Sequence, residues 1–249
     1  MKKNYRIIVA YDGTRYFGWE HQKNTDMTIQ GKMEAVLTRM VNANEPVRVI
    51  AAGRTDAGVH AKAMTCNVLL DTALSADEIM DYLNHYLPDD IGVQDVKEAG
   101  ERFHSRFNAT GKTYRYTCYC GKQKPIFERK YVYVLEQKPN LEKMRQAAAL
   151  LIGTHDYKSF CGNPKMKKST VRTVDAIVIA EENGYLTFTY HGDGFLQHMI
   201  RIMTGTLLEV GFGKRTPESM TEVLLAEDRM QAGVTAPAQG LCLMEVDYN

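Results

Sequence analysis

The order in which strand-like and helix-like segments follow one another restricts the possible folds of this chain more than any other feature. Apolar residues that alternate with polar ones indicate strands, and apolar residues that recur every three to four positions indicate helices. In the first half the order is β-α-β-β-α-β, in the ranges 5–11, 28–41, 47–52, 63–70, 75–87 and 91–96. This is the order of the split βαβ, or ferredoxin-like, arrangement.

The second half repeats this order with one additional helix. Its strand-like segments are 113–119, 171–180, 185–191 and 241–247, its helix-like segments are 140–152 and 195–210, and a short helix opens at Thr216-Pro217. We therefore predict an α+β protein of two tandem ferredoxin-like halves, residues 1–106 and 107–249, each built on an antiparallel sheet. Two sheets in tandem form a natural cleft, so we expect a central cleft.

Capping and turn residues support several of these boundaries. Thr28 and Asn140 are typical helix N-caps. Ser75 and Glu78 have the spacing of a capping box. Asn183-Gly184, between two strand-like runs, is typical of a hairpin turn. We expect three helix starts and one hairpin at these residues.

A loop with two glycines separates the second and third predicted strands. Within the loop 51–61, Gly53 and Gly58 flank Arg54 and Asp56. Ordinary hairpins need only two to five loop residues, so a loop of this length favours a functional role. The alternative is a surface ion pair between Arg54 and Asp56, which would contribute about 0 to 1 kcal/mol.

An aromatic cluster in 15–19 follows the first predicted strand and contains the only tryptophan of the chain, Trp19. Aromatic residues of a loop can stack on nucleobases, but packing on their own domain is the more common outcome. We expect this segment to pack as a flap on its own half.

Positive charge is concentrated in one stretch, although the net charge of the chain is only +1. Between Arg102 and Lys130 there are eight lysines and arginines and one acid, Glu128, which gives +7 and leaves −6 for the remainder. Such asymmetry indicates a basic surface that follows phosphates, or alternatively a solvated charged face. Because the stretch begins the second half, we expect the cleft to be basic, with Asp56 at its floor.

The cysteines and the apolar runs argue against a secreted disulfide-bonded protein, a metal-binding protein and a membrane protein. Five cysteines without the spacing of a disulfide framework are typical of reduced thiols in the cytoplasm. Cys118 and Cys120 would share one face of a strand, but none of the seven histidines adds ligands at a recognisable spacing, so we expect no metal site. No apolar run reaches about 18 residues, and the N-terminus lacks the apolar core of a secretion signal. We expect a cytoplasmic protein without a membrane span.

Five motifs in a fixed order give the chain a resemblance to a known family. They are Tyr11-Asp12-Gly13 with Gly18-Trp19, then residues 53–61 (GRTDAGVHA), 112–116 (KTYRY), 194–201 (GFLQHMIR) and 235–241 (TAPAQGL). With these motifs the chain resembles the tRNA pseudouridine synthases of the TruA family across essentially its whole length. The resemblance implies the pseudouridine synthase fold, isomerisation of uridine to pseudouridine at positions 38 to 40 of the tRNA anticodon stem-loop, no metal or organic cofactor, and a homodimer.

The resemblance implies three catalytic residues. Asp56 matches the essential aspartate, Tyr114 the tyrosine that stacks on the uracil, and Arg201 the arginine that pairs with the aspartate. A carboxylate with a reference pKa of ~3.9 is ionised at neutral pH and can act as a nucleophile or stabilise a cationic sugar. At ~4 Å and an effective dielectric of ~20, the two charges attract by about 4 kcal/mol before desolvation. Attack on C1′, abstraction of the C2′ proton and addition to the base all remain compatible with these residues.

The resemblance also implies residues that bind the RNA. Arg54 would help to hold the RNA in place of the flipped-out nucleotide. His198 lies three residues before Arg201 at the edge of the buried stripe of helix 195–210, and we expect it to contact backbone or phosphate. The other expected substrate contacts are His60, Tyr114, Lys165, Lys167, Lys168 and Arg172. Without the resemblance, the basic run of Lys165, Lys167 and Lys168 with Arg172 would more often be a solvated loop.

Two positions depart from the family pattern. Glu20 follows Trp19 where glutamine is common, and Gln197-His198 differs from the residues often found there. Neither touches the three catalytic positions, but either is compatible with a shifted choice of uridine. The alternatives are such a synthase, or a catalytically silent tRNA-binding paralogue. A nucleoside glycosidase would need a second carboxylate as proton donor, and none stands out.

Overall fold

Two compact units make up the chain in the computed structural model, which describes residues 2–163 and 165–249. The first unit contains the residues up to Thr110 together with Cys242–Asn249, and the second contains Gly111–Leu241. This division lies a few residues beyond the boundary predicted at 106–107. It also places the last strand, which was predicted for the second half, in the first unit.

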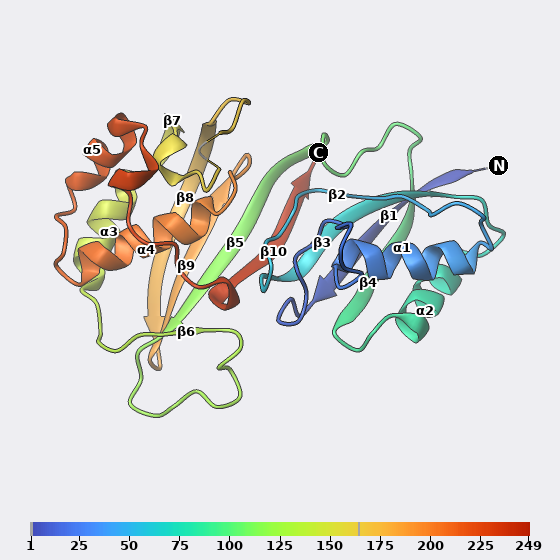
Figure 1. Cartoon of the computed structure of the whole chain (residues 1–249), viewed down its shortest axis with the longest axis horizontal. Helices are drawn as coiled ribbons and strands as arrows, with labels where there is room; N and C mark the ends of the chain where they lie inside the picture. Colours follow the sequence, from blue (N-terminus) through green and yellow to red (C-terminus); the bar gives the residue numbers. More distant parts are fainter. Residues whose placement is uncertain (1, 164) are drawn as a thin grey trace. The chain divides into compact units, whose positions relative to one another are not determined.

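The first unit has the predicted order of elements. Its strands and helices are β1 (Lys3–Tyr11), α1 (Ile29–Met40), β2 (Val49–Ala51), β3 (His60–Leu70), α2 (Ala76–Tyr86), β4 (Ile91–Ala99) and β10 (Leu241–Tyr248), shown in Figure 1. The β-α-β-β-α-β prediction for residues 5–96 is therefore confirmed, although β3 begins three residues earlier than the predicted start at 63.

The sheet of the first unit has the strand order of a ferredoxin-like fold. β1 pairs antiparallel with both β4 and β3. The other edge of β3 is shared: β2 pairs antiparallel with its second half, as in Val49↔Val68, and β10 pairs parallel with its start, as in Cys242↔His60. The prediction of purely antiparallel sheets is thus wrong for β10. Since β2 is only three residues long, it leaves the first part of β3 open to a second neighbour.

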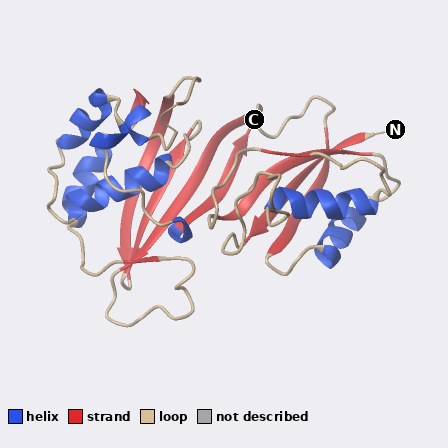
Figure 2. Ribbon diagram, viewed as in Figure 1, coloured by secondary structure: helices blue, strands red, loops and turns tan. Residues whose placement is uncertain are grey.

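One face of this sheet is covered by α1 and α2, which also contact each other (Figures 1 and 2). Alternate residues of β1 are buried, as the period of a strand requires. They pack with the apolar stripe of the two helices. The core includes Tyr5, Ile7, Val9, Ile29, Met33, Leu37, Met64, Ile79 and Leu83.

The local signals for helix starts are confirmed. The Thr28 side chain accepts a hydrogen bond from the backbone N–H of Gly31 at 3.2 Å. Ser75 and Glu78 form the complete capping box, and the Asn140 side chain caps the first helix of the second unit. Each cap satisfies backbone donors that the first turn of a helix leaves unpaired.

In its described residues, the second unit contains four antiparallel strands and three α-helices. Its elements are β5 (Ala109–Tyr119), β6 (Tyr133–Val134), α3 (Leu141–Ala149), β7 (Gly153–Asp156), β8 (Val171–Glu182), β9 (Tyr185–Gly192), α4 (Met199–Gly211) and α5 (Ser219–Ala226). The strand order is β5-β9-β8-β7, and the short β6 pairs parallel with the end of β5. Asn183 and Gly184 have φ of 50° and 81°, so the predicted Asn-Gly hairpin is confirmed.

The helices of the second unit differ from the prediction at their ends. α4 begins at Met199 rather than at Phe195, because His198 has φ of 60° and cannot continue a helix. α3 ends at Ala149 rather than at Ile152, and α5 begins at Ser219, so that Pro217 precedes it. β6 and β7 were not predicted, because they are only two and four residues long.

The predicted buried stripe of α4 is also broader than expected. In Met199–Gly211 all residues except Arg201 and Glu209 are buried. A helix that is apolar on all sides is buried on all sides, and α4 packs against α3 (Figure 1). Arg201 and Glu209 are therefore the two residues of α4 that are not buried and can make polar contacts at its surface.

Candidate functional site

The loop that carries Asp56 runs from Ala52 to Val59, between β2 and β3. Asp56 is half-buried, and its backbone carbonyl accepts a hydrogen bond from the N–H of Val59 at 3.2 Å. Gly58 has φ of 77°, a left-handed conformation that favours glycine. The tight turn after Asp56 therefore requires Gly58, whereas Gly53 has no positive φ.

A second segment, residues 12–19, supports this loop. An added Cβ at Gly13 would lie 2.0 Å from the carbonyl oxygen of Val59. At Gly18, whose φ is 102°, it would lie 2.7 Å from the carbonyl oxygen of Thr55. Both glycines therefore allow the two backbones to approach more closely than any side chain would permit.

Hydrogen bonds join the same two segments. The hydroxyls of Tyr11 and Thr55 are 2.8 Å apart, and the N–H of Trp19 donates to the carbonyl of Thr55 at 3.1 Å. The N–H of Gly58 donates to the carbonyl of Tyr16 at 3.2 Å. The loop is thus attached on both sides of Asp56, so its backbone is fixed before substrate binds.

The aromatic cluster packs as predicted on its own unit. Tyr16 and Trp19 are each only 2% exposed, whereas Phe17 is 57% exposed. Arg15 and the Tyr16 hydroxyl both bind the carboxylate of Asp90, the latter at 2.6 Å. Burial and the hydrogen bond to this carboxylate raise the pKa of Tyr16 to about 12. This ion pair and hydrogen bond hold the supporting segment against the start of β4.

Arg54 and His60 have different environments. Arg54 pairs with Glu20 at 2.9 Å, and both side chains are more than half exposed, so the pair contributes about 0 to 1 kcal/mol and can give way to another anion. Glu20 was not predicted as the partner of Arg54. His60 is buried, and its Nδ1 lies 3.1 Å from both the N–H of Gly13 and the Asp12 carboxylate.

Tyr114 lies on β5 of the second unit and is 8% exposed. The ring of Phe195 packs edge-on against it, with centroids 5.5 Å apart and an interplanar angle of 84°. Edge-to-face packing of this kind fixes the ring plane. The motif residue Phe195, which was predicted to lie in a helix, is therefore a neighbour of Tyr114.

Arg201 and Glu209, the two α4 residues that are not buried, hold the segment 232–240, which we call the strap. Arg201 Nε donates to the carbonyl of Ala236 at 2.8 Å, and the N–H of Ala236 donates to the carbonyl of Arg201 at 3.0 Å. The Glu209 carboxylate accepts from the N–H of Val234 at 3.2 Å and pairs with Arg215 at 2.5 Å. The strap thus orients the guanidinium of Arg201.

The strap crosses α4 at Gly205. An added Cβ there would lie 1.9 Å from the carbonyl oxygen of Val234. At the other end of the strap, the Tyr116 hydroxyl of β5 donates to the carbonyl of Pro237 at 2.7 Å. The matched motif 235–241 is therefore explained by packing: it connects α4 with the strand that carries Tyr114.

His198 lies next to Gly162, three residues before the basic segment 165–172. An added Cβ at Gly162 would lie 2.4 Å from the His198 ring, and the N–H of Gly162 donates to the carbonyl of Gln197 at 2.7 Å. The three lysines that follow, Lys165, Lys167 and Lys168, are exposed. Arg172 donates to the carbonyl of Ser169 at 3.1 Å. The start of the basic segment is thus anchored beside the N-terminus of α4.

Asp56 belongs to the first unit, and Tyr114 and Arg201 belong to the second. Their joint action in one basic cleft therefore remains a prediction.

Among the described residues, no group of three or more histidines, cysteines and carboxylates is arranged to hold a metal ion. The cysteines are free, and burial raises the pKa of the Cys118 thiol. In the described part of the chain, no helix is long and apolar enough to cross a bilayer.

Comparison with known proteins gives one consistent result. The family model for tRNA pseudouridine synthase matches residues 7–108 and 147–249. The chain belongs to the tRNA pseudouridine synthase family. The tRNA pseudouridine synthase A of Bacillus sp. (strain KSM-64) is 42% identical over 98% of this chain and 99% of its own length. That of Clostridium kluyveri is 40% identical over 99% of this chain and its full length.

Other relatives of this synthase family include a tRNA pseudouridine synthase A 2 of Bacillus anthracis, 39% identical over 98% of this chain and 99% of its own length. Among solved structures, a chain of a Cbf5-Nop10-Gar1 complex has a TM-score of 0.40 at 12% identity, covering 96% of this chain and 48% of that chain. That likeness is too weak to support an argument. The predicted family membership and the α+β class are confirmed.

The matched ranges of the family model contain some of the site residues of the synthase but not all of them. Asp56 and its supporting segment lie in the first matched range, and Arg201, the strap and the basic segment lie in the second. Tyr114 lies between the two ranges, although the full-length relatives cover it. The structural support for Tyr114 is therefore its position on β5 and its contact with Phe195.

Proposed function

We propose that this synthase isomerises uridine to pseudouridine at positions 38 to 40 of the tRNA anticodon stem-loop, with Asp56 as the catalytic carboxylate. The observation that carries the proposal is the rigid attachment of a half-buried aspartate to the backbone of residues 12–19. In the reaction the C1′–N1 bond breaks, a C1′–C5 bond forms, and the proton on C5 leaves while N1 gains one. No atom other than protons is exchanged, so the isomerisation consumes no oxidant, reductant or group donor.

Tyr114 and Arg201 have separate roles in this proposal. Tyr114 stacks on the uracil once the base has left the helix, which costs a few kcal/mol for a stacked base and less for an unpaired one. Arg201 holds the Asp56 carboxylate ionised. The hydrogen bond from Arg201 Nε to the carbonyl of Ala236 supports this role, because it orients the guanidinium.

The proposed RNA contacts are electrostatic for the most part. Arg54 exchanges Glu20 for a phosphate, which is inexpensive because the surface pair is weak. The remaining proposed contacts are His60, His198, Lys165, Lys167, Lys168 and Arg172. The protein acts in the cytoplasm as a homodimer, and light scattering at micromolar concentration tests the dimer.

Release of tritium from tRNA labelled at C5 of uridine tests the activity. The purified protein is expected to release tritium from an unmodified transcript that carries uridines at positions 38 to 40. Mapping of pseudouridine in the product distinguishes these positions. Pseudouridine at another uridine would indicate a shifted site choice, and binding without release would indicate a silent tRNA-binding paralogue.

Alanine at Lys165, Lys167 and Lys168 together is expected to weaken tRNA binding and to reduce its salt dependence. Each lost phosphate contact lowers the slope of log Kd against log salt concentration by about 0.7, so the triple variant loses about 2. Titration of labelled tRNA at several salt concentrations measures the slope.

The matched control for this triple variant replaces Lys3, Lys97 and Lys138. All three are more than half exposed and already paired with carboxylates, at 2.8 Å, 3.2 Å and 2.6 Å. Their replacement should leave the slope unchanged. An equal effect of the two sets of substitutions would assign the salt dependence to overall charge instead of to the basic segment.

A further inference from the structure

A turn outside the Asp56 loop, residues 102–108, presents an aromatic pair on the surface of the first unit. Phe107 is 79% exposed. The ring of His104 stacks on it, with centroids 4.1 Å apart and 27° between the planes. A single exposed apolar side chain is ordinary on a protein surface, so its orientation and its neighbours decide what it can bind.

Hydrogen bonds fix the shape of this turn. The Nδ1 atom of His104 accepts from the N–H of Arg106 at 3.2 Å and of Phe107 at 3.3 Å, which holds the ring in place. The Asn108 side chain accepts a hydrogen bond from the N–H of His104 at 2.7 Å, and the N–H of Asn108 donates to the carbonyl of His104 at 3.0 Å. The aromatic pair is therefore ordered in the absence of a ligand, which lowers the entropy cost of binding.

The middle of the turn is anchored to three strands through Ser105, which is fully buried. Its N–H donates to the Asn67 side chain of β3 at 2.9 Å, and its hydroxyl donates to the carbonyl of Ile50 in β2 at 2.5 Å. Its carbonyl accepts from the Tyr248 hydroxyl of β10 at 2.7 Å. The exposed part of the turn thus stands on a rigid base.

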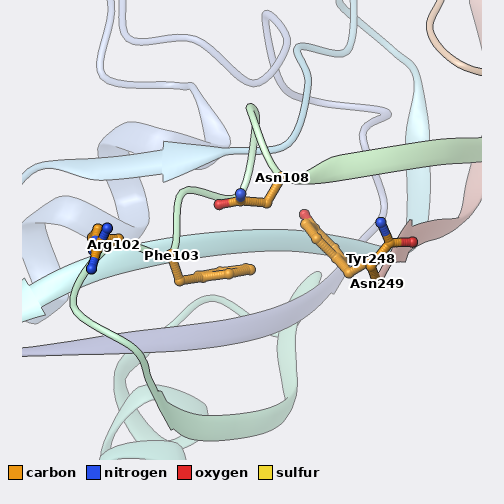
Figure 3. Close-up of a pocket in the computed structure, with 5 residues that line it drawn as sticks. All are labelled: Arg102, Phe103, Asn108, Tyr248 and Asn249. Atoms are coloured by element: carbon orange, nitrogen blue, oxygen red, sulfur yellow. The ribbon is translucent and has the colours of Figure 1, made fainter.

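Positive charge and a pocket accompany the aromatic pair. Arg102 and Arg106 are exposed, and the turn contains no acidic residue. A pocket of ≈ 360 Å³ lies at the two ends of the turn. In Figure 3 the Phe103 ring is seen between Arg102 and Tyr248. The lining residues of the pocket are Arg102, Phe103, Asn108, Tyr248 and Asn249.

We propose that the turn 102–108 is a second RNA-binding site of the synthase, at which the Phe107–His104 pair stacks on an unpaired nucleobase of the tRNA. Arg102 and Arg106 contact the adjoining phosphates. This rests on the proposed function, because it names a further contact with the same substrate. Proteins hold single-stranded nucleic acid by this combination of aromatic stacking and cationic side chains. Charge complementarity favours RNA over a second protein surface, since the exposed apolar ring is accompanied by two exposed cations in a turn without acidic residues.

Substitution of Phe107 tests the proposal through the Kd for an unmodified tRNA transcript, measured by fluorescence anisotropy. Phe107→Ala is expected to weaken binding by about 5-fold to 100-fold, the range for loss of one base stack. Phe107→Leu, which keeps an apolar side chain but loses the π face, should weaken it similarly. Phe107→Trp should bind within about twofold of the original protein or more tightly. The steady-state KM should rise in parallel with Kd while kcat stays near its original value.

Leu225→Ala is the matched control, because Leu225 is also 79% exposed but lies on α5 and has no ring. It should leave Kd unchanged. An unchanged Kd for Phe107→Ala, or full binding by Phe107→Leu, would overturn the stacking site. A fall in oligomeric mass on light scattering with Kd unaltered would assign Phe107 to a contact between copies of the chain. Tritium release by the original protein is the control for the proposed function. If that function is wrong, the original protein neither binds nor converts tRNA, and this result differs from every outcome above.

Discussion

Replacement of Asp56 by alanine is expected to lower tritium release from C5-labelled tRNA to less than about a thousandth of the original rate. Removal of a group that acts on the reacting atoms typically costs ~10²-fold to 10⁴-fold, and more when the group is a nucleophile. Asp56→Asn keeps the shape of the side chain and removes its charge, so it should be equally inactive. Single-turnover release with excess enzyme measures the chemical step without interference from product release.

Two controls accompany the Asp56 variants. Asp81→Ala, an exposed aspartate on α2, should retain full activity. Arg201→Ala combined with Asp56→Ala should be no worse than Asp56→Ala alone, because groups that act as one unit are not additive. Circular dichroism and tRNA affinity verify that the variants are folded. Tritium release by Asp56→Asn at the original rate would remove Asp56 from the mechanism.

Introduction of a methyl group at Gly13 is expected to have the second-largest effect, although Gly13 does not touch the reacting atoms. Its added Cβ would lie 2.0 Å from the carbonyl oxygen of Val59, a backbone atom that cannot rotate away. The loop must therefore move, and overpacking of this kind costs about 1–3 kcal/mol of stability. A displacement of about 1 Å at the reacting group can cost ~10²-fold in rate. We expect Gly13→Ala to lower kcat by that order and to lower the thermal midpoint.

Gly92→Ala is the matched control for this prediction. Gly92 lies on β4 in the same unit, and an added Cβ there has no heavy atom within 4 Å. Its variant should keep both kcat and the thermal midpoint. If Gly13→Ala kept the original kcat, the close approach of residues 12–19 would not position Asp56, and the observation that carries the proposed function would lose its significance.

The features predicted correctly from the sequence depend on residues that are close together in the chain. The Thr28 cap and the Ser75–Glu78 capping box involve partners three residues apart, and the Asn183-Gly184 hairpin requires only positive φ at two adjacent residues. Alternation and helical periodicity are equally local. For this reason the order of elements in the first unit could be predicted, and with it the α+β class.

The errors arise where distant residues decide the outcome. The periodicity of 195–210 does not show that His198 takes a left-handed conformation, which depends on its packing beside Gly162. The partner of the last strand is set by the shortness of β2, which leaves the start of β3 open. Neither fact is encoded in the segment whose structure was predicted.

By itself, the sequence determined the order of strands and helices, the motifs and therefore the family, and the aspartate on which the proposed chemistry depends. Only the tertiary structure decided why certain positions within and beside these motifs are glycines and charged residues. Gly13 meets Val59, and Gly205 meets Val234, across 46 and 29 residues of chain respectively. Arg201 is oriented by Ala236 of the strap. Such contacts arise from close packing of segments that are far apart in the chain, so local propensities cannot predict them.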